Sequence, residues 1–587
     1  MADAISTSSE GSQEFKKSNG KQYTESVGMF QNLVTLRNQD GDFQIPEKWR
    51  TPLKLLGGLI VLIIIVILVW AELTERATHL GHRTYEDGCS RRYFGEDSFV
   101  CVCNGSYCDE IRPIGHLERN EAIVYETSAA ESRLRRLFHR FQDERPENEH
   151  VIRVDLANPK HSILGFGGTL TDSAYFNLVK YTNLTNLLLN QFFGERGIKY
   201  NMLKVPAGST EFSEECYTYN DKSFDYGLRT FSLENDSKVP FIKDILALNN
   251  DIKLLATGYS APGWMKNSHK ILGPGELKGS PQDIYYSLYT EYLIRYLEQT
   301  RTLGLNFWGI SPLNEPLTSL TANDTASPRM AMSSDNLRQF INDVFGPSLK
   351  GNKLTKDVNI VFHEDAKNSL LGNVNTLYQD GSAFIDGFSV HSNFLNSNKS
   401  VNNLIQTHNF QPDKFILSTE SVHRGSVSQG SWKYAADYAS DIISSLNHYV
   451  NGYIDYNLAL NEEGGPSLNR QTASASIIVN SHNAAEFYKQ PSYYAIGHFS
   501  HFIPPGSKVL PIAIRNNEDE SVVYTPGPIE CLAVRTPEMN VVLILHNIED
   551  RVHALTIDAS TQKTKRFLNV GMAPKSIRTV VWRVEAE

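Results

Sequence analysis

The sequence has few cysteines, no excess of basic residues and no glycine-rich phosphate loop. Its 587 residues include six cysteines, and 66 acidic residues outnumber 56 basic ones, for a net charge of −10. An acidic chain without a basic stripe argues against a protein that binds along nucleic acids. The glycine-rich run GFGGTLTD at 165–172 lacks the GxGxxG spacing of a dinucleotide-binding loop. We therefore expect no nucleic-acid partner and no cofactor.

Four of the six cysteines are crowded together, at Cys89, Cys101, Cys103 and Cys108. Their spacings of 12, 2 and 5, with no histidine between them, fit a zinc site poorly. Two small disulfide loops, Cys89–Cys101 and Cys103–Cys108, fit better if the segment lies outside the cytosol. The sequence leaves open whether Cys216 and Cys531 pair with each other or stay as buried thiols.

Residues 55–71 form an uncharged apolar run of 17 residues. As a helix this run spans roughly 25 Å, slightly less than the hydrocarbon core of a bilayer. Basic residues precede the run and acidic residues follow it, so residues 1–53 are expected in the cytosol and the rest on the other side. The pattern predicts a type II single-pass protein with an uncleaved signal anchor at 54–71. A cleaved signal peptide is the main alternative.

Other features agree with that orientation. Residues 1–53 are polar and read as a disordered tail, and 72–86 read as a stalk. All N-x-S/T triplets that we consider follow the apolar run, which fits a glycosylated part in the lumen of the lysosome or secretory pathway, or outside the cell. They start at Asn104, Asn183, Asn235, Asn323 and Asn398.

From Ile163 to about Leu460, eight short apolar runs alternate with stretches of helical periodicity. This alternation predicts an α/β fold, a (β/α)8 TIM barrel, with an open doubly wound sheet as the alternative. From about Lys508 the segments are short and β-branched, which predicts an antiparallel β-sandwich. Too few strands remain there for a complete sandwich, so we expect the residues near 115–158 to contribute.

Two glutamates follow barrel runs at the ends where TIM barrels hold their chemistry. Glu315 follows the fourth run in ISPLNEP, and Glu420 lies in the seventh run, FILSTES. A retaining glycosidase needs two such carboxyl groups, about 5–5.5 Å apart. Asn314 is suited to bind a sugar 2-hydroxyl. The run 363–365, HED, is an alternative metal site, but its place at a strand end favours pocket lining, so no metal is expected.

Long ordered motifs along the chain resemble those of the glucosylceramidase (acid β-glucosidase) family. These motifs are FVCVCNGSYCD, GFGGTLTDSA, LLATGYSAPGWMK, LNEP, STES, NLALNEEGGP and FYKQPSYYAIGHFSHFIPPGS. The resemblance implies a barrel of 161–460 with about 489–502, and a β-sandwich of 113–160 with about 503–587. It also implies a small three-stranded, disulfide-bearing piece of 87–112 with about 461–488.

The resemblance also implies roles for individual residues. Glu315 matches the acid/base, Glu420 the nucleophile and Asn314 the 2-hydroxyl contact. Both disulfide pairings and glycosylation at Asn104 match the family as well. The other substrate contacts by position are Asp172, Glu211, Tyr259, His391, Asn393, Tyr456 and Gln471.

The chain departs from the family pattern around the sugar pocket. Lys204 and Glu211 stand where the family usually has Arg and Asp, and lysine lacks the bidentate fork of arginine. Tyr259 and Tyr456 align with tryptophans, and Asn393 lies where a tyrosine is usual. These changes leave the paired glutamates in place but put the identity of the sugar in question.

These observations predict a retaining β-glucosidase that hydrolyses glucosylceramide, or a related glycolipid, at a membrane. A small lipid-activating protein is a partner that only the resemblance implies. The alternatives are a retaining β-glycosidase for another sugar and a non-catalytic glycan- or lipid-binding relative. The mechanism requires Glu315 protonated and Glu420 ionised, so we expect burial and a neighbouring charge to raise the pKa of Glu315.

Overall fold

The computed structural model describes residues 88–584, except for 149, 382, 393, 395, 396, 517–526 and 562. The predicted tail, anchor and stalk therefore lie outside the described residues, as does Asn393. Within the described ranges, no helix has the length and apolar character needed to cross a bilayer. The anchor at 54–71 stays a prediction.

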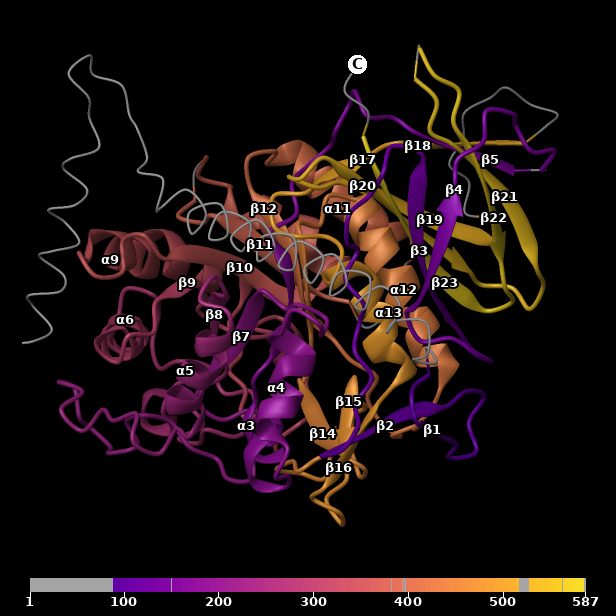
Figure 1. The fold of residues 1–587 in the computed structure, drawn as a ribbon. Coiled ribbons are helices and arrows are strands. Elements are labelled where there is room, and N and C mark those ends of the chain that lie inside the picture. The colour runs from indigo at the N-terminus through magenta and orange to yellow at the C-terminus, as the bar shows by residue number, and fades with distance from the viewer. Residues whose placement is uncertain are drawn as a thin grey trace, which may run out of the picture. The chain divides into compact units, whose positions relative to one another are not determined.

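Eight parallel strands close into a barrel in chain order, and the last strand pairs with the first through Gly452 and Gly165 (Figure 1). Every one of the eight apolar runs supplies one strand, so the predicted TIM barrel is confirmed. The strands are β6 Gly165–Thr169, β7 Met202–Ala207, β8 Lys253–Gly258, β9 Phe307–Ser311, β10 Asn359–Ala366, β11 Gly387–His391, β12 Phe415–Ser421 and β13 Gly452–Asp455.

Helices connect successive barrel strands, as the alternating pattern predicts. The longest is α6, Ile284–Thr302, whose buried face includes four tyrosines. The others are α3 Asp172–Tyr175, η1 Phe176–Lys180, α4 Thr185–Phe193, α5 Lys238–Leu248, η2 Gly263–Met265, α7 Thr318–Thr321, α8 Ser334–Gln339, η3 Phe340–Phe345, α9 Gly346–Gly351, η4 Lys367–Ser369, α10 Leu370–Leu377, α11 Asn398–Phe410 and α12 Trp432–Asn447. A further helix, α13 Pro491–Ser500, follows the last barrel strand.

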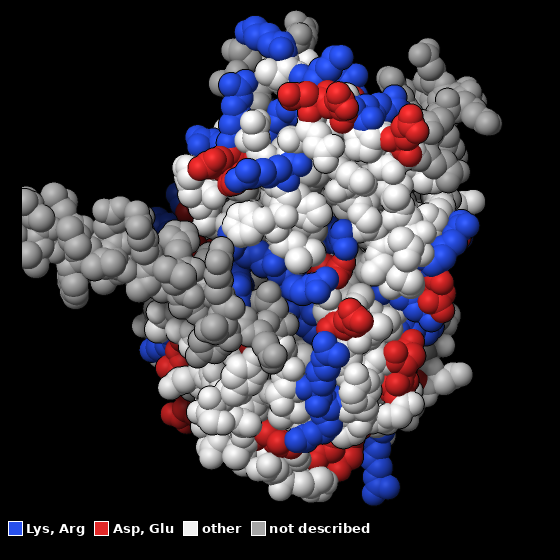
Figure 2. Space-filling view, turned by 45° about the vertical axis from the view of Figure 1, so that its right-hand side comes forward, with Lys and Arg blue, Asp and Glu red and all other residues white. Residues whose placement is uncertain are grey.

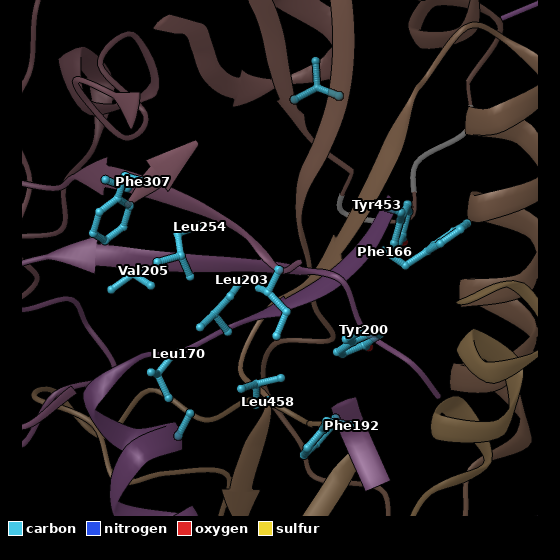
Figure 3. Packing of buried hydrophobic residues seen from close by; sticks show 14 of the residues in the cluster. Phe166, Leu170, Phe192, Tyr200, Leu203, Val205, Leu254, Phe307, Tyr453 and Leu458 are labelled. Atoms are coloured by element: carbon cyan, nitrogen blue, oxygen red, sulfur yellow. The ribbon is translucent and has the colours of Figure 1, made fainter. Parts of the chain in front are cut away.

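Side chains alternate between the inside and the outside of the barrel. Met202 packs with residues of four other barrel strands inside the barrel, whereas Leu203 and Val205 belong to the larger cluster that includes the helices. Figure 3 shows residues of this larger cluster, with Leu203 and Val205 near Leu254 of β8 and with Phe192 of α4 near Tyr200. Because successive strand residues face opposite sides, Lys204 points into the barrel two residues beyond Met202. This places a charged side chain directly above the apolar interior.

Two sheets beside the barrel form the sandwich, and their strands come from both ends of the described chain (Figure 1). The six-stranded sheet has the order β17-β19-β20-β23-β3-β4 and the four-stranded sheet β18-β5-β21-β22. Val124, Ile152, Leu543 and Trp582 meet in the core that these sheets share. The strands are β3 Glu121–Ser128, β4 Arg135–Arg140, β5 His150–Val154, β17 Lys508–Leu510, β18 Ile512–Asn516, β19 Ile529–Arg535, β20 Asn540–Asn547, β21 His553–Asp558, β22 Phe567–Met572 and β23 Ser576–Arg583.

A smaller sheet carries the two disulfides, Cys89–Cys101 and Cys103–Cys108, which are the pairings that the resemblance implies. It has five strands, where the resemblance implies three, because the chain leaving β13 adds a parallel pair before it returns to the cysteine segment. Cys216 and Cys531 are both free thiols. The strands are β1 Arg91–Arg92, β2 Val100–Asn104, β14 Ala459–Asn461, β15 Ile477–Val479 and β16 Glu486–Lys489.

Acidic and basic side chains are interspersed over the face that Figure 2 shows. Lysine and arginine side chains gather in a hollow near its middle, with acidic side chains beside them. No continuous basic stripe crosses the described part of this face.

Candidate active site

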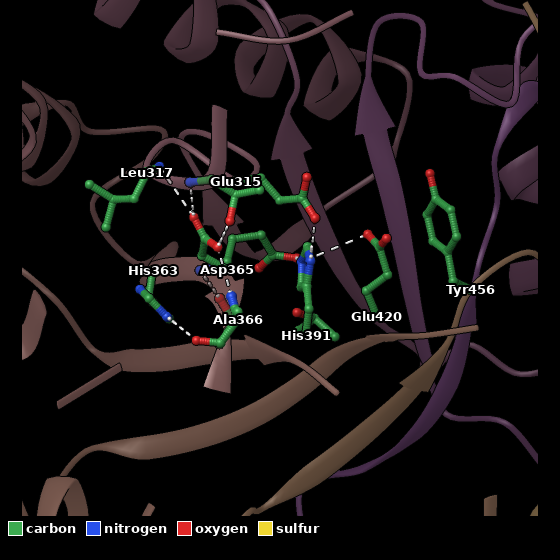
Figure 4. A network of polar contacts seen from close by, with 12 residues as sticks. Glu315, Leu317, His363, Asp365, Ala366, His391, Glu420 and Tyr456 are labelled. Atoms are coloured by element: carbon green, nitrogen blue, oxygen red, sulfur yellow. Dashed lines mark hydrogen bonds and ion pairs between the residues drawn. The ribbon is translucent and has the colours of Figure 1, made fainter. Parts of the chain in front are cut away.

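The structure brings Glu315 and Glu420 together at the carboxyl ends of barrel strands. Glu315 lies in the turn after β9, and Glu420 is the penultimate residue of β12. One oxygen of each carboxylate and one ring nitrogen of His391 all lie within 4.8 Å of one another. Figure 4 shows His391, the last residue of β11, between the two glutamates. Three neighbouring parts of the barrel rim therefore converge on one small space.

His391 links the two carboxylates directly. Its Nδ1 lies 3.1 Å from Glu315 Oε1, and its Nε2 lies 3.7 Å from Glu420 Oε2. Burial alone would lower the pKa of His391, but the charge of Glu420 and the hydrogen bonds to Glu315 and Glu364 raise it to about 10. The imidazole is therefore a cation, and both of its ring nitrogens can donate hydrogen bonds.

The turn that holds Glu315 has a constrained backbone. Glu315 has a φ of +45°, in the left-handed region that costs a non-glycine residue about 1–3 kcal/mol. Its N–H donates to the carbonyl of Glu364 at 2.9 Å. The Asp365 carboxylate accepts the N–H groups of Leu317 at 3.2 Å and Thr318 at 3.0 Å. These bonds fix the turn and so aim the Glu315 side chain.

The HED run of β10 serves three different purposes. Its register against β11 shifts between His363 and Asp365, and His363 and Glu364 have φ values of +93° and +45°. His363 Nε2 lies 3.1 Å from the Ala366 carbonyl, Asp365 holds the Glu315 turn, and Glu364 turns toward Lys204. A bulge of this kind re-aims single side chains. The three residues do not converge as a metal site would require.

Lys204 and Glu364 form a buried ion pair beneath the two catalytic candidates. Lys204 Nζ lies 2.6 Å from Glu364 Oε1 and 3.5 Å from Glu420 Oε2, and the side chains of Lys204 and Glu364 are fully buried. Burial would raise the pKa of Glu364, but Lys204 and His391 lower it below its usual range. Burial would lower the pKa of Lys204, but Glu364 and Glu420 raise it. Both groups therefore stay charged.

Replacing this lysine tests how far the pair supports the fold. We expect Lys204→Met to lower the free energy of unfolding by about 3–5 kcal/mol, because it removes the closest countercharge of the buried Glu364 carboxylate. The measurement is chemical denaturation followed by intrinsic fluorescence. Lys433→Met is the matched control, since Lys433 forms an exposed ion pair with Asp437 that is worth at most about 1 kcal/mol. Equal losses in the two variants would contradict the argument.

The state of Glu315 differs from the prediction. Burial does act to raise its pKa, as expected, but the hydrogen bond and charge of His391 and the charges of Arg329 and Arg424 lower it below its usual range. The prediction of a raised pKa was therefore wrong for the structure as it stands. The reason is that three cations gather around this carboxylate, and the prediction took no account of two of them.

Those two cations are arginines on loops at the rim. Arg329 Nη1 lies 2.7 Å from Glu315 Oε2. Arg424 Nη2 lies 2.6 Å from Glu420 Oε1, and its Nη1 lies 3.1 Å from Glu211 Oε1. Sequence reasoning missed both. Arg424 follows Glu420 by four residues, which was a usable hint, whereas nothing in the segment around Arg329 points to the site.

Several of the predicted sugar contacts lie beside Glu420. The Tyr456 hydroxyl donates to Glu211 Oε1 at 3.2 Å, and the Tyr259 hydroxyl donates to that of Tyr456 at 3.3 Å. Burial raises the pKa of both tyrosines well above 10, so they remain donors. Asn314 is also buried, and its Oδ1 has no hydrogen-bond partner among the described residues. The two tyrosines and Glu211 are thus joined by hydrogen bonds, and the side-chain oxygen of Asn314 is available to accept one.

For Asp172 and Gln471 the structure gives no contact with Glu315 or Glu420 among the described residues. The Asp172 carboxylate pairs with Lys238, accepts from Ser213, and accepts from the Tyr217 hydroxyl at 3.0 Å, so the protein itself uses much of its capacity. Gln471 is partly buried in the loop whose next residues pair with the Arg424 segment. The role of both as substrate contacts stays a prediction.

The predicted glycosylation positions are accessible to different degrees. Asn104 is partly buried, and its side-chain oxygen accepts from the backbone N–H groups of Ser106 and Tyr107. The remaining four asparagines are exposed, namely Asn183, Asn235, Asn323 and Asn398. Their exposure is compatible with attached glycans.

The cluster of Glu315, His391 and Glu420 also has the ligand types of a divalent-metal site. The surrounding charges oppose this use. Lys204 lies 3.5 Å from Glu420, while Arg329 and Arg424 each occupy a carboxylate oxygen. A metal ion would have to displace these cations or lie against them. The arrangement instead suits acid–base and nucleophilic chemistry by the two carboxyl groups.

Comparison with known proteins agrees with the barrel. The Glycosyl hydrolase family 30 TIM-barrel domain matches residues 163–503. Putative glucosylceramidase 3 of Caenorhabditis elegans is 34% identical over 86% of this chain and 96% of its own length. Lysosomal acid glucosylceramidase of Mus musculus is 32% identical over 84% of this chain and 95% of its own length.

More distant relatives share the architecture. An endo-1,6-beta-D-glucanase, neg1 of Aspergillus fumigatus, is 25% identical over 66% of this chain and 79% of its own. The crystal structure of SrfJ from Salmonella typhimurium covers 79% of this chain and 100% of its own, with a TM-score of 0.70 and 22% identity. The endo-beta1,6-glucanase BT3312 gives a TM-score of 0.67. These two structures bear on the fold alone.

Proposed function

Because the chain belongs to glycosyl hydrolase family 30, and is therefore a glycoside hydrolase, we propose that it cleaves a β-glucosyl bond with retention of configuration. The observation that carries this proposal is the spacing of Glu315 and Glu420, which have carboxylate oxygens within 4.8 Å of each other. Retaining enzymes hold their carboxyl groups about 5–5.5 Å apart, whereas inverting enzymes separate them by about 6.5–9.5 Å to admit a water. The spacing here leaves room for an anomeric carbon but little for an added water.

In the proposed mechanism Glu420 is the nucleophile. Its Oε2 faces the buried Lys204 and His391, while its Oε1 faces Arg424, whose side chain is 39% exposed. One of the two carboxylate oxygens of Glu420 attacks the anomeric carbon. The bond to the leaving oxygen breaks as the bond to Glu420 forms. The charges of Lys204 and His391, 3.5 Å and 3.7 Å from Oε2, orient the carboxylate.

Glu315 is the proposed acid/base. In the first step it gives a proton to the leaving oxygen, and in the second it takes a proton from the water that attacks the glycosyl–enzyme. The nearby imidazolium of His391 stabilises the carboxylate form that exists between the two steps. The buried Asn314 amide, just before Glu315, is the proposed contact for the sugar 2-hydroxyl.

The proposed substrate is glucosylceramide, cleaved to glucose and ceramide. The support is that relatives at 32–34% identity, aligned over nearly their whole lengths, are named glucosylceramidases. A second candidate is a β-glycosidase for another sugar. It is favoured by Glu211, Tyr259 and Tyr456, which differ from the family pattern, and by relatives named endo-1,6-beta-D-glucanases.

We also propose that the catalytic part lies in a lumen or outside the cell, held to a membrane by residues 54–71, in the lysosome or secretory pathway. The two disulfides and the exposed N-x-S/T asparagines support an oxidising compartment. A membrane anchor would keep the site near a lipid substrate, and a small lipid-activating protein would be a further partner. A full-length protein without N-glycans and with both disulfides reduced in cells would contradict this placement.

A substrate panel tests the proposed function. We expect the full-length protein to hydrolyse glucosylceramide in mixed micelles and aryl β-glucosides, and to release β-glucose as the first product seen by NMR. Aryl β-galactosides, aryl β-xylosides and a β-1,6-glucan are the comparison substrates. Preference for one of these would favour the second candidate. First release of α-glucose would exclude retention.

A further inference from the structure

Arg329 stands out because it lies on a loop at the barrel rim and directly contacts the proposed acid/base. Its Nη1 lies 2.7 Å from Glu315 Oε2, and its Nε lies 3.3 Å from Asp324 Oδ2. The Arg329 side chain is 23% exposed and that of Glu315 18%. An ion pair this close and this sheltered from water is screened less than a surface pair. The positive charge of Arg329 therefore lowers the proton affinity of Glu315.

The loop that carries Arg329 is built to hold it in place. Asp324 accepts the N–H groups of Ala326 at 2.9 Å and Ser327 at 3.2 Å, which fixes the turn before the arginine. The buried Lys266 donates to the carbonyl of Arg329. The flanking Met330 and Met332 are fully buried. The guanidinium is therefore held against Glu315 by the loop itself.

Other charges around Glu315 come from every neighbouring element. His391 of β11 lies against Oε1, and Arg424 of the loop after β12 adds a second guanidinium nearby. Glu420 of β12 and Glu364 of β10 lie next to His391, on the side of the ring away from Glu315.

The remaining charges affect the partners of Glu315. The charge of Glu211, in the segment after β7, raises the pKa of Arg329. Lys204 of β7 pairs with Glu364, and Asp365 of β10 holds the turn. Among these charges, Arg329 alone pairs with Oε2.

We propose that Arg329 is a positioning residue: it holds Glu315 as half of an ion pair in the empty site, so that the acid/base takes up its proton only in an acidic medium. This inference rests on the proposed function, since it concerns the proton that Glu315 donates. The geometry of the ion pair carries it, and the lowered pKa of Glu315 agrees with it. The enzyme would then be active at low pH and lose activity as the pH rises.

The sign of the effect is fixed by the charge. Glycosylation needs protonated Glu315, so the basic limb of kcat/KM reports loss of that proton in the free enzyme. A cation beside the carboxylate favours the charged form and moves this limb to lower pH. Removing the cation moves the limb to higher pH. A merely structural role for Arg329 would reduce activity at every pH without moving the limb.

The test is the pH dependence of kcat/KM for the full-length protein on an aryl β-glucoside. We expect Arg329→Gln to move the basic limb upward by at least about 1 pH unit, and Arg329→Lys to stay close to wild type because it keeps the charge. Arg301→Gln is the matched control, since Arg301 is exposed and donates to the Leu354 carbonyl. Burial lowers the pKa of Lys266 to about 7, but this group is unchanged in all variants and so cannot produce a difference.

A second variant, expected to shift the pH profile in the opposite direction, keeps the inference testable if Arg329→Gln does not fold. Asp324→Asn keeps an oxygen for the loop N–H groups but removes the carboxylate that shares Arg329, so the basic limb should move to lower pH. An active Arg329→Gln with the wild-type limb would overturn the inference and leave the proposed function standing. If Arg329→Gln fails to fold, an unmoved limb in Asp324→Asn would overturn it instead. Wild-type protein without glycosidase turnover would end both.

Discussion

Glu420→Gln is expected to reduce turnover of an aryl β-glucoside by roughly 10,000-fold or more, the largest effect of any single substitution in this chain. An amide is a poor nucleophile, and no other carboxylate can replace it. Glu364 is fully buried and paired with Lys204, and Glu211 is paired with Arg424. The glycosyl–enzyme should therefore not form.

The sharper measurement is covalent labelling by a mechanism-based epoxide inhibitor, followed by peptide mass spectrometry. Wild-type protein should carry one label at Glu420, and Glu420→Gln should carry none. Glu291→Gln is the matched control, because Glu291 is an exposed residue of α6 whose ion pair among the described residues is with Arg295. It should label and turn over like wild type. A label on wild type at a carboxylate other than Glu420 would contradict the assigned nucleophile.

The second large effect is expected for Glu315→Gln, and it should depend on the leaving group. For glucosylceramide, whose leaving alkoxide needs a proton, kcat should fall by roughly 100- to 10,000-fold. For a dinitrophenyl β-glucoside, which leaves without protonation, the first step should be nearly unaffected. The slow second step should then make the glycosyl–enzyme accumulate as a burst.

Azide provides the complementary readout for Glu315→Gln. As a small anion that needs no general base, it should restore turnover of the dinitrophenyl substrate and yield a β-glucosyl azide. Glu291→Gln should show neither burst nor rescue. Equal losses for both leaving groups, or the absence of azide rescue, would assign Glu315 a role other than acid/base.

The barrel could be predicted from sequence because each strand is a short apolar run between polar loops. Runs such as YNMLKVP and IKLLATG are buried on both faces, and a parallel sheet covered by helices requires this pattern. The small sheet was predicted less well. Its parallel pair, β14 and β15, joins segments of only three residues each, and such pieces have no recognisable period.

The residues of the candidate site likewise fall into some that could be predicted from the sequence and some that could not. Glu315 and Glu420 could be found because each lies at or just after the end of a recognisable strand in a barrel, where strand ends meet at one rim. Glu364 was noticed only as part of a possible metal run, since the bulge that turns it toward Lys204 is a matter of backbone conformation. Arg329 lies 14 residues beyond Glu315 in a loop, and no periodicity predicts where such a loop returns.

The sequence by itself determined the eight-stranded barrel and the placement of two glutamates at the ends of its strands, because hydrophobic periodicity and strand order are local properties of the chain. Only the tertiary structure decided the charge state of the site. The proton affinity of Glu315 depends on cations from three separate segments, His391, Arg329 and Arg424, that meet within a few ångströms. Electrostatic energy depends on distance in space, and distance along the chain does not report it.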